Sequence, residues 1–410
     1  MLYDMVFEGG GAKGMVFVGA LAELEARGYS PARLIGTSAG SIMATFLAAG
    51  YTVAEMTAAL SEKRDDQPVF LGFLETQEAI SRDEIAHSTI REFLREVNLR
   101  FVPDQIENKL DDAIANALAS NHTTSRIFSF IERGGFYSAN YFLTWLKSKL
   151  NAGIYPLERG AHKMGEPRKF GDMNLAEFYT ATGIDLSLVA SDTTGSELLI
   201  LNNRTAPGCP LIWAVRMSMS VPMLWNEVTW QEEWGAYRGK DITGHCIVDG
   251  GLLSNFPIEL FISNQPQVTA VMGAKVADEL DLLGFLIDES QEVPNAPAVK
   301  STAKKFHIGK LRPVSRMADL VNTMMQARDK SVIDAFERFV IRLPAKGYGT
   351  IEFGMSDERR DALIAAGRQA TFAYLERLEA QQFEASFGIE GDSAEKLAPT
   401  ADKIAARILF

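Results

Sequence analysis

The chain has few of the residues that metal sites and disulfide frameworks need. Among its 410 residues there are two cysteines, Cys209 and Cys246, and five histidines. They form no Cys-x-x-Cys pair and no mixed His/Cys cluster, which argues against a zinc site. With so few thiols the fold is not expected to depend on disulfides, as is typical of a reducing compartment.

An excess of positive charge is also absent. The chain has 41 Lys and Arg against 53 Asp and Glu, so its formal net charge is −12. Proteins that bind nucleic acids need clustered cations to neutralise phosphates. The composition therefore argues against a nucleic-acid partner.

Long hydrophobic runs are missing as well. The most apolar window, around residues 34–60, is interrupted by Gly36, Gly40, Gly50 and Glu55, so it is not expected to span a membrane. No basic segment followed by an apolar one precedes the first predicted strand, which argues against a cleavable signal. We expect a soluble, cytoplasmic protein that associates transiently with membranes, with signal-independent export left open.

The first fifty residues alternate between strand and helix patterns. Residues 2–7 and 32–36 are short apolar runs that predict buried strands, and each is followed by glycines and then by apolar residues at helical spacing. The two predicted helices end at Gly28 and Gly50. This order is typical of a mainly parallel sheet with helices on both faces, a three-layer α/β/α sandwich.

The rest of the chain has a less uniform pattern. Polar, amphipathic segments predict a helical insertion at about residues 64–130. Further strands are predicted at 185–194, 197–203, 245–248 and 268–276. Beyond residue 280 the pattern is mostly helical, with one candidate strand at 339–344.

One pentapeptide, Gly36-Thr37-Ser38-Ala39-Gly40, fits the G-x-S-x-G pattern. Glycines two positions either side of a serine let the backbone turn sharply and expose the hydroxyl at a helix N-terminus. Serine is also a favoured helix N-cap, so the pentapeptide alone leaves a purely structural role open.

Three glycine-rich turns follow predicted strands: residues 8–14 (EGGGAKG), the pentapeptide, and Asp249-Gly250-Gly251. The loops at the carboxyl ends of parallel strands gather at one edge of a sheet, where ligands bind. We therefore expect Ser38 and Asp249 to meet there, although they are far apart in the sequence.

The first turn also fits the dinucleotide fingerprint G-x-G-x-x-G through Gly9, Gly11 and Gly14. However, the second predicted strand runs into the serine turn instead of ending near an acidic residue that would hold a ribose. No Lys-Ser or Lys-Thr follows the glycines, which disfavours a P-loop. Beside a serine, bare glycine amides are better suited to stabilise an oxyanion.

A serine nucleophile needs a general base. The usual order Ser-Asp-His would require a histidine after the acid, and only His307, in a lysine-rich segment, follows Asp249. Asp249 is a better candidate for the base than His307, because it follows a predicted strand and begins one of the three glycine-rich turns. An aspartate can act as the base if burial raises its pKa.

Taken together, EGGGAKG, GTSAG and DGG resemble, in order and spacing, the motifs of the patatin-like phospholipase family. The resemblance covers roughly residues 4–275 and implies an α/β/α hydrolase that cleaves lipid acyl esters with a Ser-Asp dyad and no cofactor. It assigns Ser38 as the nucleophile and Asp249 as the base, with the amides of Gly10 and Gly11 as the oxyanion hole.

Further expectations follow from the resemblance. The other motif residues, Gly9, Ala12, Gly14, Gly36, Gly40, Gly250 and Gly251, would shape the site, and Lys13 is a candidate for contacting a lipid head group. The hydrolase domain would span residues 4–275, followed by a mostly helical region at 276–410. The expected partner is a phospholipid or another acyl-ester lipid at a membrane surface. The oligomeric state and any activating ligand or protein stay open.

Other functions compete with this interpretation. The glycine loop could hold phosphate in a nucleotide- or partner-binding protein, and His307 could complete a Ser-His-Asp esterase. Trp225, Trp230 and Trp234 could line an acyl pocket, although core packing is favoured. Residues 68–74 could form an apolar lid, or simply be half-buried.

Overall fold

The computed structural model describes most of the chain, and all structural statements below concern the residues that it describes. They are residues 2–74, 81–98, 122–275, 282–297, 332–386 and 397–409.

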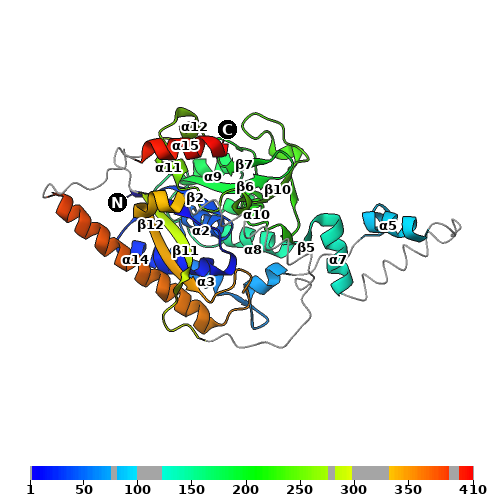
Figure 1. Ribbon diagram of the computed structural model, residues 1–410, viewed down its shortest axis with the longest axis horizontal. Coiled ribbons are helices and arrows are strands. Elements are labelled where there is room, and N and C mark those ends of the chain that lie inside the picture. Colours follow the sequence, from blue (N-terminus) through cyan, green and yellow to red (C-terminus); the bar gives the residue numbers. More distant parts are fainter. Residues whose placement is uncertain are drawn as a thin grey trace.

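One central sheet organises the molecule (Figure 1), and its strands run in the order β12-β11-β1-β2-β6-β10-β9, with β7 paired to β6 on the side. The pairs from β12 to β6 are parallel, whereas β7 and β10 pair with β6 in the antiparallel direction and β9 pairs antiparallel with β10. The strands are β1 Leu2–Phe7, β2 Ser30–Thr37, β6 Asp185–Asp192, β7 Glu197–Leu201, β9 Val228–Thr229, β10 Cys246–Asp249, β11 Leu282–Glu292 and β12 Val340–Lys346. The predicted mostly parallel sheet is confirmed.

Successive side chains of the central strands enter two different cores. Met5 and Phe7 pack in the larger core on one face, while Val6 between them packs in the smaller core on the other face. Leu34 and Ile35 divide in the same way. Because both faces are covered, β1 and β2 are buried at most of their positions, as in parallel sheets generally.

Helices form the two outer layers. The larger core is covered by α1 Val16–Ala26, α2 Ala39–Ala48, α3 Val53–Leu60, α8 Asn140–Leu150, α9 Leu175–Thr182, α10 Leu211–Ser218 and α14 Asp357–Ser386, and the smaller core by α11 Glu259–Ile262, α12 Pro266–Met272 and α15 Ala398–Leu409. In Figure 1 the long α14 runs beside β11 and β12, and α15 lies beside α11 and α12. The described part of the chain therefore has the predicted three-layer architecture.

The strand predicted at 268–276 is wrong. Residues 268–272 of that segment belong to the helix α12, which begins at Pro266 and ends at Met272, and residues 273–275 follow it without regular structure. A short apolar run has no clear period, and proline at the first helical position favours a helix start. The sequence analysis did not predict β11, which pairs with β1 on the side opposite β2.

The region after residue 280 contributes to the central sheet as well as to its helical layers. β11 and β12 are both strands of the sheet, and β12 confirms the candidate strand at 339–344. The sheet therefore extends past the domain boundary predicted at residue 275.

The predicted helical insertion is only partly helical. It begins with a hairpin of β3 Lys63–Arg64 and β4 Gln67–Pro68 and the 3-10 helix η2 Val69–Leu74, and it continues with α4 Arg82–Ala86, α5 Thr89–Asn98 and α7 His122–Arg133. In Figure 1, α5 and α7 extend to one side of the sandwich. The small sheet of β5 Gly135–Tyr137 and β8 Met223–Trp225 joins the end of this insertion to the body of the molecule. Residues 103–121 of the predicted insertion lie outside the described residues.

The remaining short elements are 3-10 helices at turns: η1 Gly11–Met15, η4 Phe170–Asp172, η5 Glu232–Trp234, η6 Gly250–Leu252 and η8 Glu337–Phe339. No helix within the described ranges is both long and apolar enough to cross a bilayer.

Candidate active site

Ser38 is the single residue between β2 and α2, and its backbone is strained. Its φ of 52° and ψ of −121° lie outside the regions that L-residues normally adopt. The neighbouring glycines allow the tight turn: a Cβ on Gly36 would lie 2.3 Å from the Gly40 carbonyl oxygen, and a Cβ on Gly40 would lie 2.3 Å from the Phe7 carbonyl oxygen. The two glycines of the predicted motif are therefore required by the close packing of the backbone.

The end of α10 and the residues that follow it support both residues of the predicted catalytic pair. The Ser38 N–H donates to the Ser218 Oγ at 3.0 Å, and the Asp249 N–H donates to the Ser220 carbonyl oxygen at 2.9 Å. The buried guanidinium of Arg216 donates to the Ser220 Oγ and, at 2.8 Å, to the Asn226 carbonyl oxygen. Burial lowers the pKa of Arg216 to about 9. These hydrogen bonds fix the position of the backbone segment that contacts Ser38 and Asp249.

Asp249 ends β10 and its carboxyl is fully buried. The Oδ1 atom accepts a hydrogen bond from the Gly251 N–H at 2.8 Å. The Oδ2 atom is buried, and no described residue gives it a hydrogen bond of ordinary geometry. Burial raises the pKa of Asp249 to about 7, against weaker lowering effects from hydrogen bonding by the Ser38 side chain and the Gly251 N–H. The Ser38 side chain thus lies close enough to Asp249 to affect its pKa, but no well-formed hydrogen bond joins the two side chains among the described residues, as is common in apo enzymes.

Ser38 and Asp249 come together by a different route from the one predicted. β10 runs antiparallel to β6, so its carboxyl end does not belong with those of the parallel strands. However, β10 is short, and its last residue, Asp249, lies opposite Ala190 of β6. The neighbouring residue Val189 pairs with Thr37, which directly precedes Ser38 in the chain. The prediction that the two residues meet agrees with this geometry, but the topological reason given for Asp249 was wrong.

The glycine loop after β1 packs directly on Ser38. A Cβ on Gly9 would lie 2.9 Å from the Ser38 Cβ, and Gly11 has a φ of +56°, a conformation that favours glycine. Among the described residues, none accepts a hydrogen bond from the N–H of Gly10 or Gly11. Of these two residues, Gly11 lines the cavity beside Ser38.

Two polar side chains brace this loop, and the sequence analysis did not predict either role. The Glu8 carboxylate accepts a hydrogen bond from the Ile287 N–H at 2.6 Å. The Asn255 amide donates to Glu8 at 3.1 Å and to the Gly9 carbonyl oxygen at 3.0 Å. The sequence feature that could have indicated the role of Asn255 is its position just after the Asp-Gly-Gly turn.

Lys13 does not extend into the cavity beside Ser38. Its side chain is buried and forms an ion pair with Glu289 of β11, and it is not among the residues that line the cavity. Gly14 packs close to α2, since a Cβ there would lie 2.9 Å from the Ala39 Cβ. The geometry thus gives no support to a head-group contact by Lys13.

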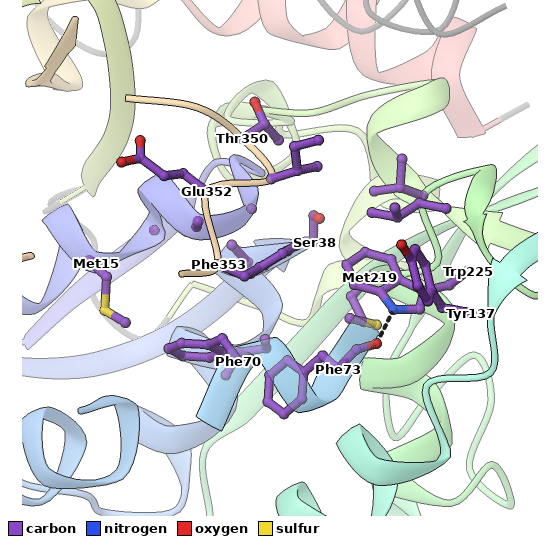
Figure 2. A pocket seen from close by; sticks show the side chains of 18 of the residues that line it. Met15, Ser38, Phe70, Phe73, Tyr137, Met219, Trp225, Thr350, Glu352 and Phe353 are labelled. Carbon is purple, nitrogen blue, oxygen red and sulfur yellow. Dashed lines mark hydrogen bonds between the residues drawn. The ribbon is translucent and has the colours of Figure 1, made fainter. Parts of the chain in front are cut away.

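A cavity of about 510 Å³ opens beside Ser38, in the size range of small-molecule sites. Its walls are mostly apolar and include five methionines, Met15, Met43, Met219, Met223 and Met355. Figure 2 shows Ser38 between Phe353 on one side and Tyr137 with Trp225 on the other, with Phe70 and Phe73 below. The dashed line is the hydrogen bond from the Trp225 Nε1 to the Phe73 carbonyl oxygen, 2.9 Å long.

The cavity wall includes several segments that the sequence analysis considered separately. Phe70 and Phe73 belong to the apolar segment 68–74, and Trp225 lines the cavity, whereas Trp230 and Trp234 are buried in the core. Thr350, Glu352 and Phe353, from the loop between β12 and α14, were not predicted. The Thr350 carbonyl oxygen accepts a hydrogen bond from the Ala12 N–H at 2.8 Å, so this loop also holds the glycine turn.

No histidine among the described residues lines the cavity. His245 pairs instead with Asp192, at 2.6 Å between Nδ1 and Oδ2, and His307 lies outside the described residues. In the described part of the chain, no group of three or more His, Cys, Asp or Glu side chains could hold a metal ion.

Comparisons with known proteins point to one family. A model described as patatin-like phospholipase matches residues 5–262. The chain is 26% identical over 385 residues to YqhO of Bacillus subtilis strain 168, described as an uncharacterized protein, covering 92% of this chain and 99% of YqhO.

Two solved structures resemble the chain at lower similarity. VipD from Legionella pneumophila has a TM-score of 0.44 and 18% identity, covering 92% of this chain and 67% of VipD. ExoU from Pseudomonas aeruginosa, solved in complex with SpcU, has a TM-score of 0.35 and 15% identity, covering 92% of this chain and 52% of ExoU. The chain thus spans about half of the ExoU chain.

Proposed function

The chain belongs to the patatin-like phospholipase family, which supports a lipid hydrolase activity, and from this premise we propose that it cleaves acyl esters of phospholipids through a Ser38–Asp249 dyad. The observation that carries the proposal is the environment of Asp249. Its carboxyl is buried beside Ser38, in the turn between β2 and α2, and burial raises the pKa of Asp249 to about 7. An aspartate with this pKa can take a proton from a serine hydroxyl as the hydroxyl attacks a carbonyl carbon.

In the proposed first step, the Ser38 Oγ bonds to the ester carbonyl carbon while its proton moves to the Asp249 carboxylate. The negative charge develops on the carbonyl oxygen, where the N–H groups of Gly10 and Gly11 stabilise it. When the tetrahedral intermediate collapses, the ester C–O bond breaks and Asp249 returns the proton to the leaving alcohol. The product on the enzyme is an acyl ester of Ser38.

The second step releases the acyl group with water. Asp249 takes a proton from a water molecule as the water attacks the acyl carbonyl, and the same amides hold the new oxyanion. Collapse breaks the bond to Ser38, which regains its proton from Asp249, and a fatty acid leaves. No step requires a metal or an organic cofactor.

The cavity walls support a lipid as the substrate. Most of the lining side chains are apolar, and the methionines among them are flexible enough to accommodate acyl chains of different shapes. We propose that the substrate reaches this cavity from a membrane surface.

The test combines labelling with hydrolysis. A fluorophosphonate should add a single mass to the wild-type protein and none to Ser38→Ala, and Ser38→Ala should lose about 10³-fold or more of the hydrolysis of phosphatidylcholine. Asp249→Asn should lose a similar factor, whereas His307→Ala should keep its activity. If His307→Ala loses as much as Asp249→Asn, the protein is a Ser-His-Asp esterase instead.

A further inference from the structure

The apolar cavity beside Ser38 contains one positively charged side chain among the described residues that line it. This residue is Arg126, which lies on α7 in the insertion. It is half-buried, and its guanidinium lies 5.3 Å from the centre of the Tyr137 ring. Tyr137 faces the cavity on the side of Trp225 (Figure 2). Arg126 therefore belongs to the wall of the cavity.

The guanidinium of Arg126 has no partner that would neutralise it in the described part of the chain. Its Nε atom is buried without a hydrogen bond, and no described carboxylate forms an ion pair with it. Among the described residues, the one acidic side chain that lines the cavity is Glu352, and it is already bound by Arg359, at 2.7 Å between Oε1 and Nε. A buried donor on a charged group that lacks an acceptor is costly to maintain, and an anionic ligand would satisfy it.

The other cations near the site do not compete for this role. Arg216 donates to Ser220 and Asn226 and does not line the cavity. Lys13, which the sequence analysis considered for head-group contact, is held by Glu289 and does not line the cavity. Among the described residues that line the cavity, Arg126 is therefore the cation with which an anionic group of a ligand can pair.

We infer that Arg126 binds the phosphate of a phospholipid and so selects phospholipids over uncharged acyl esters. This inference rests on the proposed function of the same cavity. In a glycerophospholipid the phosphate is joined to the ester groups through a few bonds of the glycerol, so both can occupy one cavity. The planar guanidinium presents paired donors that match phosphate oxygens, and the Tyr137 ring limits its orientation. In apolar surroundings this charge pairing is stronger than in water.

Two substrates that differ only in the head group test the inference: dimyristoyl phosphatidylcholine and dimyristoylglycerol, each in mixed micelles with a nonionic detergent. Arg126→Gln should lower kcat/KM for the phospholipid about 10- to 100-fold, mainly through KM, and change that for the diacylglycerol less than about twofold. Arg126→Lys should fall between Arg126→Gln and the wild type, because it keeps the charge and loses the paired donors.

Arg133→Gln is the matched control, because it removes one positive charge from the same helix and Arg133 pairs with Glu84 outside the cavity. It should leave both substrates unchanged. Equal losses on both substrates in Arg126→Gln, no loss on the phospholipid, or an equal phospholipid loss in Arg133→Gln would each overturn the inference.

A binding measurement separates this inference from the catalytic proposal. In the Ser38→Ala background, tryptophan fluorescence can follow binding of dihexanoyl phosphatidylcholine below its micellar concentration, since Trp225 lines the cavity. Adding Arg126→Gln should weaken this binding about tenfold or more. Glycerophosphocholine, which lacks acyl chains, should bind far more weakly than the lipid. If glycerophosphocholine or inorganic phosphate binds as tightly as the lipid, the cavity takes free phosphate and the inference fails. Full hydrolysis by Ser38→Ala would instead overturn the catalytic proposal, while the binding result still decides the role of Arg126.

Discussion

At the scale of single residues, Asp249 couples the chemistry of the site to the stability of the fold. Its pKa is about 7 in the folded protein because the carboxyl is buried, whereas an unfolded aspartate titrates near 4. Between these two values the unfolded chain has lost this proton and the folded protein has kept it. Stability is therefore lost as the pH rises through this window, and the loss is complete above about pH 7.

Asp249→Asn should accordingly be more stable than the wild type at pH 8, by roughly 2–4 kcal/mol, and about equally stable at pH 4. The asparagine Oδ1 can still accept the hydrogen bond that the Gly251 N–H gives to Asp249, so the turn is kept. Urea unfolding of both proteins at the two pH values measures the difference. An asparagine variant that is less stable at pH 8 would mean that the buried carboxylate is stabilised by a group not identified in this site.

In the proposed mechanism, the same pKa sets the pH dependence of catalysis. Only the ionised carboxylate can take the Ser38 proton, so kcat/KM for a water-soluble ester should rise with pH up to about 7 and then level off. Two units below the pKa the rate should be about 100-fold lower, because the ionised fraction falls about tenfold per unit. Circular dichroism at pH 5 would check that the protein is still folded there. A flat profile from pH 5 to 8 contradicts a base with this pKa.

The residue scale also shows what the sequence could and could not predict about the site. Ser38, Asp249 and the glycines lie in short local motifs, each of which has a mechanical meaning on its own. Arg126, Asn255 and Thr350 contribute to the site from distant segments that have no local signature. Their roles depend on which elements pack together, and the sequence alone does not reveal that packing.

At the scale of secondary-structure elements, the close contact between α1 and α14 depends on glycines. A Cβ on Gly19 would lie 1.8 Å from the Ile364 carbonyl oxygen, and a Cβ on Gly367 would lie 2.1 Å from the Val16 carbonyl oxygen. The two helix backbones thus approach each other at a distance that only glycine permits. This contact fixes α14 beside the sheet and, with it, the preceding loop that lines the cavity.

Gly19→Ala should therefore destabilise the protein by about 1–3 kcal/mol, even though alanine has the better helix propensity by about 1 kcal/mol. Thermal unfolding measures the effect. Ala26→Ser, at the exposed end of the same helix, is the control and should change the stability by less than about 0.5 kcal/mol. If Gly19→Ala is as stable as the wild type or more so, propensity outweighs the contact and the two helices can separate at little cost.

The elements also differ in how well the sequence predicted them. β1, β2, α1 and α2 were predicted because each glycine turn marks where one element ends and the next begins. α12 was mistaken for a strand because its apolar residues are too few to show a period of 3.6. β11 was missed because its buried first half gives way to the polar residues Asp288–Glu292 at its end. In both segments, contacts with distant parts of the chain, and not local propensity, determine whether a helix or a strand forms.

At the scale of the whole molecule, the segment after residue 275 is needed to complete the sheet and the site. β11 pairs with β1 and supplies the Ile287 N–H that binds Glu8. α14 packs on α1, and α15 packs on α11, so both helical layers depend on this segment. The loop after β12 carries the carbonyl oxygen that binds the Ala12 N–H. We therefore propose that residues 276–410 are not a separable domain.

This proposal predicts that residues 1–275 do not fold alone. Without β11, β1 becomes an open sheet edge, and the apolar side chains that face α14 and α15 are exposed, so the fragment should aggregate and lack esterase activity. Coexpression with residues 276–410 as a second chain should recover soluble protein and part of the activity, because the missing strands can pair in trans. Size-exclusion chromatography and fluorophosphonate labelling of Ser38 measure the two effects. A fragment 1–275 that is monomeric, unfolds cooperatively and labels at the wild-type rate would show that the boundary predicted at residue 275 is a true domain boundary.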